Sequence, residues 1–285
     1  MKKVPYILLA LILVIGGLLV TGCGDDETTT TTSTSTTGTV TSTTPTATTT
    51  TATQKYGGKV TFLDSRLPAT SIGLPAKLGS PDMFFMLPAL ERLFRLAPDD
   101  SLIPFLATGY TLGDDSLSIT ITLQQGVKFH DGTAFNAEAC KWNLESVKAG
   151  GIGGTEKWTT IEVIDDYTVK INLSDWSNLI LSNFTSLAGC MVSPTSIQTN
   201  GEEWAAMNIA ATGPFKLKNF ERDTILEFEK FDDYWQDRKP YVDEIVTLCM
   251  PDPMTQIATL QVGDADIAQP WIGFTIAEMK DIPGV

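Results

Sequence analysis

The chain has 285 residues, with 34 acidic and 20 basic side chains and a formal net charge of −14. This acidity argues against nucleic-acid binding, which needs a basic surface to displace counterions from phosphates. The single histidine, His130, excludes metal sites built from two histidines, and the sequence has no GxxxxGK phosphate loop and no CxxC pair. We therefore expect no metal, no cofactor and no nucleic-acid partner.

The first 22 residues have the parts of a secretory signal. Two lysines follow Met1, the next nineteen residues carry no charge, and Val20-Thr21-Gly22 stands directly before Cys23. This ending resembles the bacterial lipobox, in which the cysteine is diacylated and becomes the mature N-terminus. We predict a lipoprotein signal peptide at residues 1–22 and lipidation of Cys23. The alternative is an uncleaved membrane anchor, because nineteen residues just span a bilayer. Both place the rest of the chain outside the cytoplasm, in the periplasm or at the cell surface.

Residues 23–56 are predicted to be a disordered linker. The run Thr28–Thr53 contains 18 threonines and 3 serines in 26 residues, without a charge. Such a stretch has little to bury and cannot offset the entropy of ordering. We interpret it as a spacer that holds a globular domain away from the membrane.

The globular part that follows shows clear strand patterns. Apolar and polar residues alternate over 117–123 and over 169–173, which is typical of half-buried strands. The apolar residues of these two stretches are Leu117, Ile119, Ile121 and Leu123, then Val169, Ile171 and Leu173. A nearly continuous apolar run at 244–250 suits a strand that is covered on both faces.

Helical patterns lie between the strands. Asn136 is a good N-cap for a helix whose apolar face consists of Ala137, Cys140, Leu144 and Val147, with an acidic residue in the first turn. A second helix is expected over 255–262, ended by Gly263. Strands and helices without a regular repeat indicate an α/β or α+β protein.

Several longer strings occur in a characteristic order. The longest is Leu123–Glu138, with the sequence LQQGVKFHDGTAFNAE. The others are Pro104–Ala107, Asp166–Val169, Thr212–Phe215, Tyr234-Trp235, Lys239–Ile245 and Leu260–Ile267. Together they resemble the family 5 extracellular solute-binding proteins, the oligopeptide-, dipeptide- and nickel-binding components of ABC importers. The resemblance runs from about Gly58 to the last residue.

The resemblance implies an α/β fold of the periplasmic-binding-protein type II-like kind, with two lobes and an extra domain. It assigns residues 57–90 to the first part of lobe I, 91–203 to the extra domain inserted in lobe I, and 204–285 to the continuation of lobe I. The second lobe is expected to be absent, because the chain stops about where relatives begin the strand that leads into it. A chain of this length would offer half of a binding cleft and bind cargo weakly or not at all.

The resemblance also implies the function. We expect a lipid-anchored extracytoplasmic protein, not an enzyme, that delivers small-molecule or peptide cargo to the permease subunits of an ABC transporter, with peptides as the favoured class. Two alternatives remain open at this point. One is a secreted hydrolase that uses paired carboxylates as acid and base; the other is a structural surface protein on a Thr-rich stalk.

Two segments are predicted to contact cargo. Gln269 and Trp271 follow the short strand that ends near Ile267, a segment that borders the cleft in relatives. Phe84 and Phe85 follow a glycine-containing loop. The alternatives are that the two phenylalanines pack in the core, that Trp271 packs beneath its loop, and that Gln269 faces water.

Other residues of the strings have structural explanations. Asp131-Gly132 is typical of a turn, because glycine adopts a positive φ and aspartate bonds the backbone two residues on. We expect His130 to be a structural residue at a strand end, and Tyr234-Trp235 to close the edge of a core. Cys140 is expected to serve as a small buried hydrophobe rather than in a disulfide.

Overall fold

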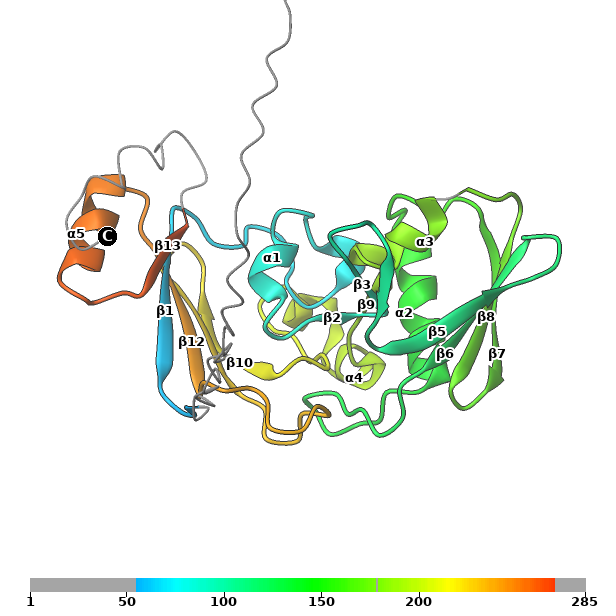
Figure 1. The fold of residues 1–285 in the computed structure, drawn as a ribbon. Coiled ribbons are helices and arrows are strands. Elements are labelled where there is room, and N and C mark those ends of the chain that lie inside the picture. Colours follow the sequence, from blue (N-terminus) through cyan, green and yellow to red (C-terminus); the bar gives the residue numbers. More distant parts are fainter. Residues whose placement is uncertain (1–54, 178, 270–285) are drawn as a thin grey trace, which may run out of the picture. The chain divides into compact units, whose positions relative to one another are not determined.

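The computed structural model describes residues 55–177 and 179–269 (Figure 1). Cys23, Trp271, the predicted signal peptide and nearly all of the predicted linker lie outside the described residues. A bilayer-spanning helix is absent from the described part of the chain.

A five-stranded sheet has the order β10-β11-β12-β1-β13 (Figure 1). Its strands are β1 (Lys59–Asp64), β10 (Phe215–Glu221), β11 (Ile225–Lys230), β12 (Glu244–Cys249) and β13 (Ile267–Gln269). β1 pairs in parallel with β12 and with β13, whereas β11 pairs antiparallel with β10 and with β12. Because parallel strands end at the same edge, Asp64 lies between its register partners Cys249 and Gln269. We call this the carboxyl edge of the sheet.

The helix α5 (Pro253–Gln261) connects β12 to β13. It begins two residues before the predicted start, because the side chain of Asp252 accepts a hydrogen bond from the Thr255 N–H at 2.8 Å and caps the helix. Gly263, with φ at +80°, follows the helix as predicted. The Asp266 carboxylate then accepts a hydrogen bond from the Thr61 N–H at 2.8 Å, which holds β13 against β1.

A first hydrophobic core lies against this sheet. Three helices contribute to it: the 3₁₀ helix η1 (Pro75–Lys77), α1 (Met83–Met86) and α4 (Pro194–Ala205). Its buried residues come from the segments Leu67–Leu90 and Leu187–Phe228. Phe228 of β11 is fully buried. Phe85 of α1 is partly buried and packs against this core.

A second core is built on an antiparallel sheet with the order β5-β6-β8-β7. Its elements are β5 (Ala107–Leu112), β6 (Ser118–Leu123), α2 (Ala137–Ala149), β7 (Trp158–Asp165) and β8 (Thr168–Leu173). The predicted cap is confirmed, since Asn136 accepts a hydrogen bond from the Ala139 N–H at 3.0 Å. The predicted apolar faces of α2 and β8 are buried, and Cys140 is fully buried as a free thiol.

One detail of the predicted strands is wrong. Leu117 directly precedes β6 and is 39% exposed, because it lies at the end of the ladder beside the turn at 114–115, although its carbonyl still accepts a hydrogen bond from the Leu173 N–H at 2.8 Å. β12 is covered on both faces only at its centre, where the adjacent Val246 and Thr247 point to opposite faces and are both buried; the other four residues are partly exposed.

Short elements complete the described fold. They are β2 (Glu91–Arg92) paired with β9 (Cys190–Met191), β3 (Phe94–Leu96) paired with β4 (Leu102–Pro104), α3 (Leu179–Asn183) and the 3₁₀ helix η2 (Leu187–Gly189). β2 stands where the chain passes from the first core, which includes Leu90, to the second, which includes Leu93.

Candidate functional site

A small pocket opens at the carboxyl edge of the five-stranded sheet. Its volume is about 130 Å³, and we call it the edge pocket. It is lined by Phe62, Leu63, Asp64, Phe84, Phe85, Pro88, Phe228, Ile245, Thr247 and Gln269. Phe62 and Asp64 are two residues apart on β1, as Ile245 and Thr247 are on β12, so each pair points to one face of the sheet. Ligands of open α/β sheets bind outside the carboxyl ends of strands, which is where this pocket lies.

The edge pocket brings together three of the four predicted cargo residues. Gln269 at the end of β13 is exposed, and Phe84 on α1 is 56% exposed although it is a large aromatic residue. Phe84 is therefore not a core residue. Phe85 is partly buried, because it packs against the first core and also lines the pocket. The fourth residue, Trp271, lies outside the described residues.

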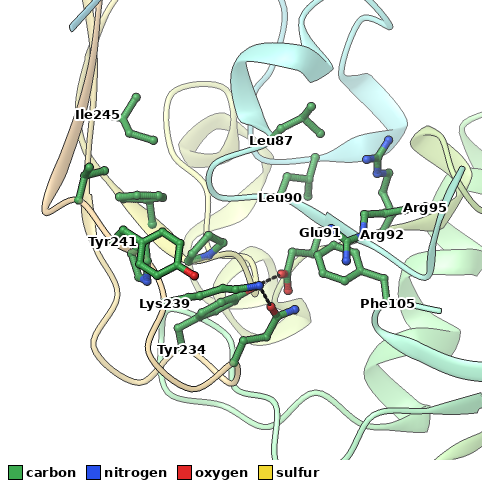
Figure 2. Close-up of a pocket in the computed structure, with 15 residues that line it drawn as sticks. Leu87, Leu90, Glu91, Arg92, Arg95, Phe105, Tyr234, Lys239, Tyr241 and Ile245 are labelled. Carbon is green, nitrogen blue, oxygen red and sulfur yellow. Dashed lines mark hydrogen bonds between the residues drawn. The ribbon is translucent and has the colours of Figure 1, made fainter. Parts of the chain in front are cut away.

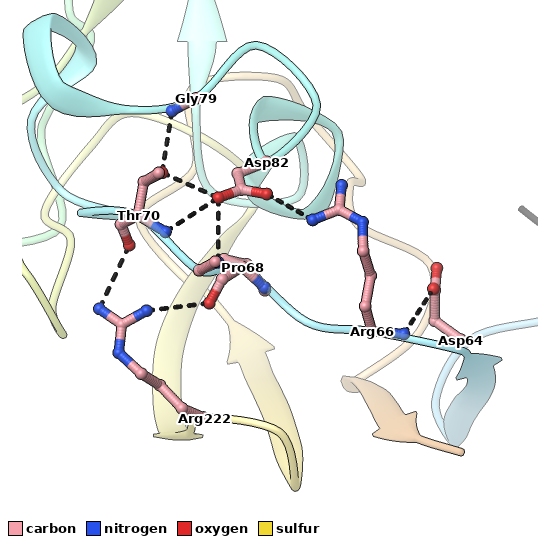
Figure 3. A network of polar contacts seen from close by, with 8 residues as sticks. Asp64, Arg66, Pro68, Thr70, Gly79, Asp82 and Arg222 are labelled. Carbon is pink, nitrogen blue, oxygen red and sulfur yellow. Dashed lines mark hydrogen bonds and ion pairs between the residues drawn. The ribbon is translucent and has the colours of Figure 1, made fainter. Parts of the chain in front are cut away.

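A buried carboxylate organises the loop beside this pocket (Figure 3). Asp82 is 4% exposed and receives the Arg66 guanidinium at 2.6 Å on one oxygen. Its other oxygen accepts hydrogen bonds from the N–H groups of Ala69 and Thr70, both at 3.0 Å, and from the Thr70 hydroxyl at 2.8 Å. Burial acts to raise the pKa of Asp82, but the hydrogen bonds from Arg66, Thr70 and Ala69 outweigh it and hold that pKa below its ordinary value. Asp82 is therefore a fixed negative charge.

A second arginine supports the same loop from the side opposite the carboxylate. Arg222 donates to the carbonyl oxygens of Pro68 at 3.0 Å and of Thr70 at 3.3 Å (Figure 3). Arg66, held by Asp82, lies over the ring of Phe85, with its guanidinium carbon 5.2 Å from the ring centroid. The loop after β1 thus places a positioned cation at the aromatic wall of the edge pocket.

A larger cavity of about 470 Å³ lies elsewhere in the fold, and we call it the Glu91 cavity (Figure 2). It is lined by Leu87, Leu90, Glu91, Arg92, Arg95, Phe105, Pro214, Phe215, Tyr234, Gln236, Lys239, Pro240, Tyr241, Val242 and Ile245. Glu91 is 2% exposed, and its two carboxylate oxygens accept hydrogen bonds from the Tyr234 hydroxyl at 2.7 Å and the Trp235 indole N–H at 2.9 Å. Burial raises the pKa of Glu91 to about 7, and the two donors only partly oppose it.

The Glu91 cavity corrects one prediction and is a weaker candidate for cargo. Tyr234 and Trp235 do not simply close a core edge, because the polar ends of both rings bind a buried carboxylate. Three of the lining residues, Tyr241, Val242 and Ile245, lie before or near the amino end of β12. The cavity thus lies mainly toward the amino end of β12, although Ile245 lines both it and the edge pocket at the strand ends where ligands of such sheets bind.

His130 is held by backbone groups, in agreement with a structural role. Its Nδ1 accepts from the Ala211 N–H at 3.2 Å, so Nε2 carries the proton and donates to the Gly213 carbonyl at 2.9 Å. Burial lowers the pKa of His130 to about 4. The neighbouring turn is as predicted, with Gly132 at φ +84° and Asp131 accepting from the Thr133 N–H at 3.0 Å. Among the described residues no group of three His, Cys, Asp or Glu side chains is arranged to hold a metal ion.

Sequence reasoning missed the polar part of the edge pocket and the Glu91 cavity. Asp64 ends the strand that pairs with β12 and β13, but the pairing of segments about 180 residues apart is not visible in the sequence. Asp82 lies two residues before the predicted Phe84, and its partners Arg66 and Thr70 precede it by 16 and 12 residues. The signal that the sequence offered for Asp82 was an acidic residue directly before the apolar helix that begins at Met83.

The described fold combines a mixed sheet, whose parallel strand ends border a pocket, with a separate antiparallel sheet that has its own core. Residues 101–285 match the bacterial extracellular solute-binding proteins, family 5, middle region. The chain belongs to this family.

Individual relatives agree. The chain is 36% identical over 185 residues to the glutathione-binding protein GsiB of Salmonella typhi. The aligned region covers 63% of this chain and 36% of GsiB. Among solved structures it is similar to NikA from Brucella suis in complex with Fe(III)-EDTA, with a TM-score of 0.66, 25% identity and coverage of 73% of this chain and 43% of NikA. It shares the fold of DppA from Helicobacter pylori in complex with the peptide STSA, with a TM-score of 0.69, 22% identity and coverage of 81% and 50%.

The chain therefore spans about a third of the length of the curated relative and half or less of the solved structures. These comparisons confirm the expected family and its α/β binding-protein fold. The family and its relatives are binding proteins, so the comparisons give no support to the hydrolase alternative.

Proposed function

We propose that this chain is part of an extracytoplasmic solute-binding protein that captures peptide cargo and delivers it to the permease subunits of an ABC transporter. The observation that carries the proposal is the edge pocket, where Gln269 meets Phe84 and Phe85 although it is far from both in the sequence. Glutathione and the peptide STSA are ligands of similar proteins and support peptides as the class of cargo.

The polar groups at the pocket fit the constant parts of a peptide. Gln269 is exposed and offers both a donor and an acceptor, and Thr247 adds a hydroxyl; Asp64 is 2% exposed and accepts a hydrogen bond from the Arg66 N–H at 3.2 Å. A peptide main chain needs donors and acceptors of this kind whatever its side chains are. Binding proteins of two lobes gain affinity from contacts made by both faces at once. We propose that residues 57–90 and 204–285 form the face of lobe I, with 91–203 as the inserted domain. The two separate hydrophobic cores support a division of this kind, although Leu187, Cys190, Val192 and Ile197 pack in the first core.

We further propose that Cys23 is lipidated and that the Thr-rich linker tethers the domain to the membrane. The proposal rests on the lipobox-like sequence before Cys23. In cells fed labelled palmitate, the wild-type protein should carry the label and sediment with membranes, whereas Cys23→Ala should lose the label. A Cys23→Ala protein that still carries the label would refute the anchor.

The cargo class is tested by ligand-observed saturation-transfer NMR, which detects binding with dissociation constants up to about 1 mM. The purified chain should transfer saturation to tri-alanine. It should not transfer it to glucose or to a nickel–EDTA chelate. Transfer to the sugar or the chelate, with none to the peptide, would overturn the proposal.

A further inference from the structure

The edge pocket has an unusual composition for a site that binds main-chain groups. Four of its lining residues are phenylalanines from three strands or helices: Phe62 on β1, Phe84 and Phe85 on α1, and Phe228 on β11. Ile245 and Pro88 add further apolar wall, and the polar side chains among the described lining residues are Asp64, Thr247 and Gln269. The wall is thus mainly apolar; of its polar residues, Asp64 and Gln269 end their strands and Thr247 lies within β12.

The size of the pocket restricts what can enter it. Its volume is about 130 Å³. An apolar cavity of about 150 Å³ accommodates one benzene ring. A whole peptide does not fit, but a single phenylalanine or leucine side chain does. A sugar would leave most of its hydroxyl groups facing phenylalanine rings, and burial of unpaired hydroxyl groups is unfavourable.

The aromatic wall is already ordered before any ligand binds. Asp82 fixes Arg66, and Arg66 lies over the ring of Phe85. Phe84, in contrast, leaves more than half of its surface exposed at the pocket. A ligand that covers the Phe84 ring would bury apolar surface at little cost in ordering, because the neighbouring groups are held in place.

We infer that the edge pocket is a specificity pocket that takes one aromatic or large aliphatic side chain of the cargo, while the peptide main chain lies along the carboxyl edge of the sheet beside the exposed Gln269. This inference rests on the proposed function, since it assumes that the cargo is a peptide. It adds a preference among peptides, for those with a large apolar side chain over those without one.

The test compares tripeptides that differ in one side chain. Phe-Gly-Gly, Gly-Phe-Gly and Gly-Gly-Phe are titrated against the chain by NMR, with Gly-Gly-Gly as reference, so that every position of the side chain is sampled. At least one phenylalanine peptide should bind about tenfold more tightly than Gly-Gly-Gly, as expected for burial of one ring. In Phe84→Ala this advantage should fall below about threefold. Phe84→Leu should retain most of it.

The matched control is Met254→Ala, which removes a 64% exposed apolar side chain of α5 outside the pocket and should leave the preference unchanged. Equal affinity for all four peptides, or a preference that survives Phe84→Ala, would overturn the specificity pocket and leave the proposed function intact. Failure of all four peptides to bind would overturn the proposed function and the pocket together.

Discussion

The edge pocket and the Glu91 cavity each depend on a buried carboxyl group, and the two groups behave in opposite ways. Asp82 is 4% exposed and Glu91 is 2% exposed, yet the pKa of Asp82 is lowered and that of Glu91 is raised to about 7. Asp82 has a guanidinium at 2.6 Å and three further N–H or O–H donors, whereas Glu91 has two neutral donors. Burial alone therefore does not decide the charge state; the number and charge of the donors do.

The difference has a functional meaning. The charges beside the edge pocket are paired and fixed, so the loop after β1 presents a stable surface to a ligand. The carboxyl of the Glu91 cavity is bound within the protein by Tyr234 and Trp235, which links β2 to a segment more than 140 residues further along the chain. We assign ligand binding to the first region and structural cohesion to the second.

The largest expected effect concerns Glu91. Its folded-state pKa lies above the value of an unfolded glutamate, so the folded protein binds this proton more tightly. The resulting stabilisation is complete below about pH 4.3 and is lost as the pH rises through 7, which corresponds to about 4 kcal/mol. Glu91→Gln should remove this part of the pH dependence in urea unfolding between pH 4 and 8. The exposed Glu203→Gln serves as control. An unchanged slope in Glu91→Gln would contradict the assignment.

The contribution of His130 to the free energy of unfolding should depend on pH by a similar amount and with the opposite sign. Its pKa is lowered to about 4 in the fold, so the unfolded state binds the proton more tightly. The stability that depends on neutral His130 is complete above about pH 6.5 and is lost toward pH 4, by about 3 kcal/mol. His130→Gln should lack this acid loss when unfolding is followed by urea titration at several pH values. Because Glu91 and His130 oppose one another over the same range, either single variant should depend on pH more steeply than the wild type. If the stability of the wild type depends on pH more steeply than that of both variants, the proposed opposition between Glu91 and His130 is wrong.

Asp82→Asn should have the next largest effect. It removes the charge that binds Arg66 and places an amide group against the N–H donors of Ala69 and Thr70. We expect a loss of about 2 kcal/mol in the free energy of unfolding at pH 7, the usual size for a hydrogen-bonded charge. Thermal unfolding measures it, with the exposed Asp114→Asn as control. In the wild type, the contribution of Asp82 to the free energy of unfolding should be lost only below about pH 3.9, because the pKa of Asp82 is lowered. A loss already at pH 5 would contradict this.

The smallest effect on stability is expected for Phe84→Ala. Its ring is 56% exposed, so its removal should lower the free energy of unfolding by less than about 1 kcal/mol. Phe228→Ala, which removes a fully buried ring behind the same pocket, should cost about 3–5 kcal/mol. Equal losses in the two variants, measured by urea unfolding, would show that Phe84 is a core residue.

Much of the fold could be predicted from the sequence, because its signals are local. The Asn136 cap, the alternation at Val169, Ile171 and Leu173, and Gly263 after a helix each depend on a few neighbouring residues, and the structure confirms them. The site depended on long-range pairing. Phe84 and Gln269 were predicted separately, whereas their meeting around Asp64 follows from the register of β1 with β13. Trp235 does pack against the edge of a core as predicted, but the hydrogen bonds that Tyr234 and Trp235 donate to Glu91 were missed, because Glu91 lies more than 140 residues away in the sequence.

The central claim is that cargo binds at the carboxyl edge of the sheet and not in the larger Glu91 cavity. It is tested most directly by mapping the backbone amide shifts of the ¹⁵N-labelled chain during titration with a phenylalanine-containing tripeptide. Ile245 lines both regions and cannot distinguish them. We predict the largest shifts at Phe84, Thr247 and Gln269. Shifts confined to Leu90 and Tyr241, in the Glu91 cavity, would contradict the account.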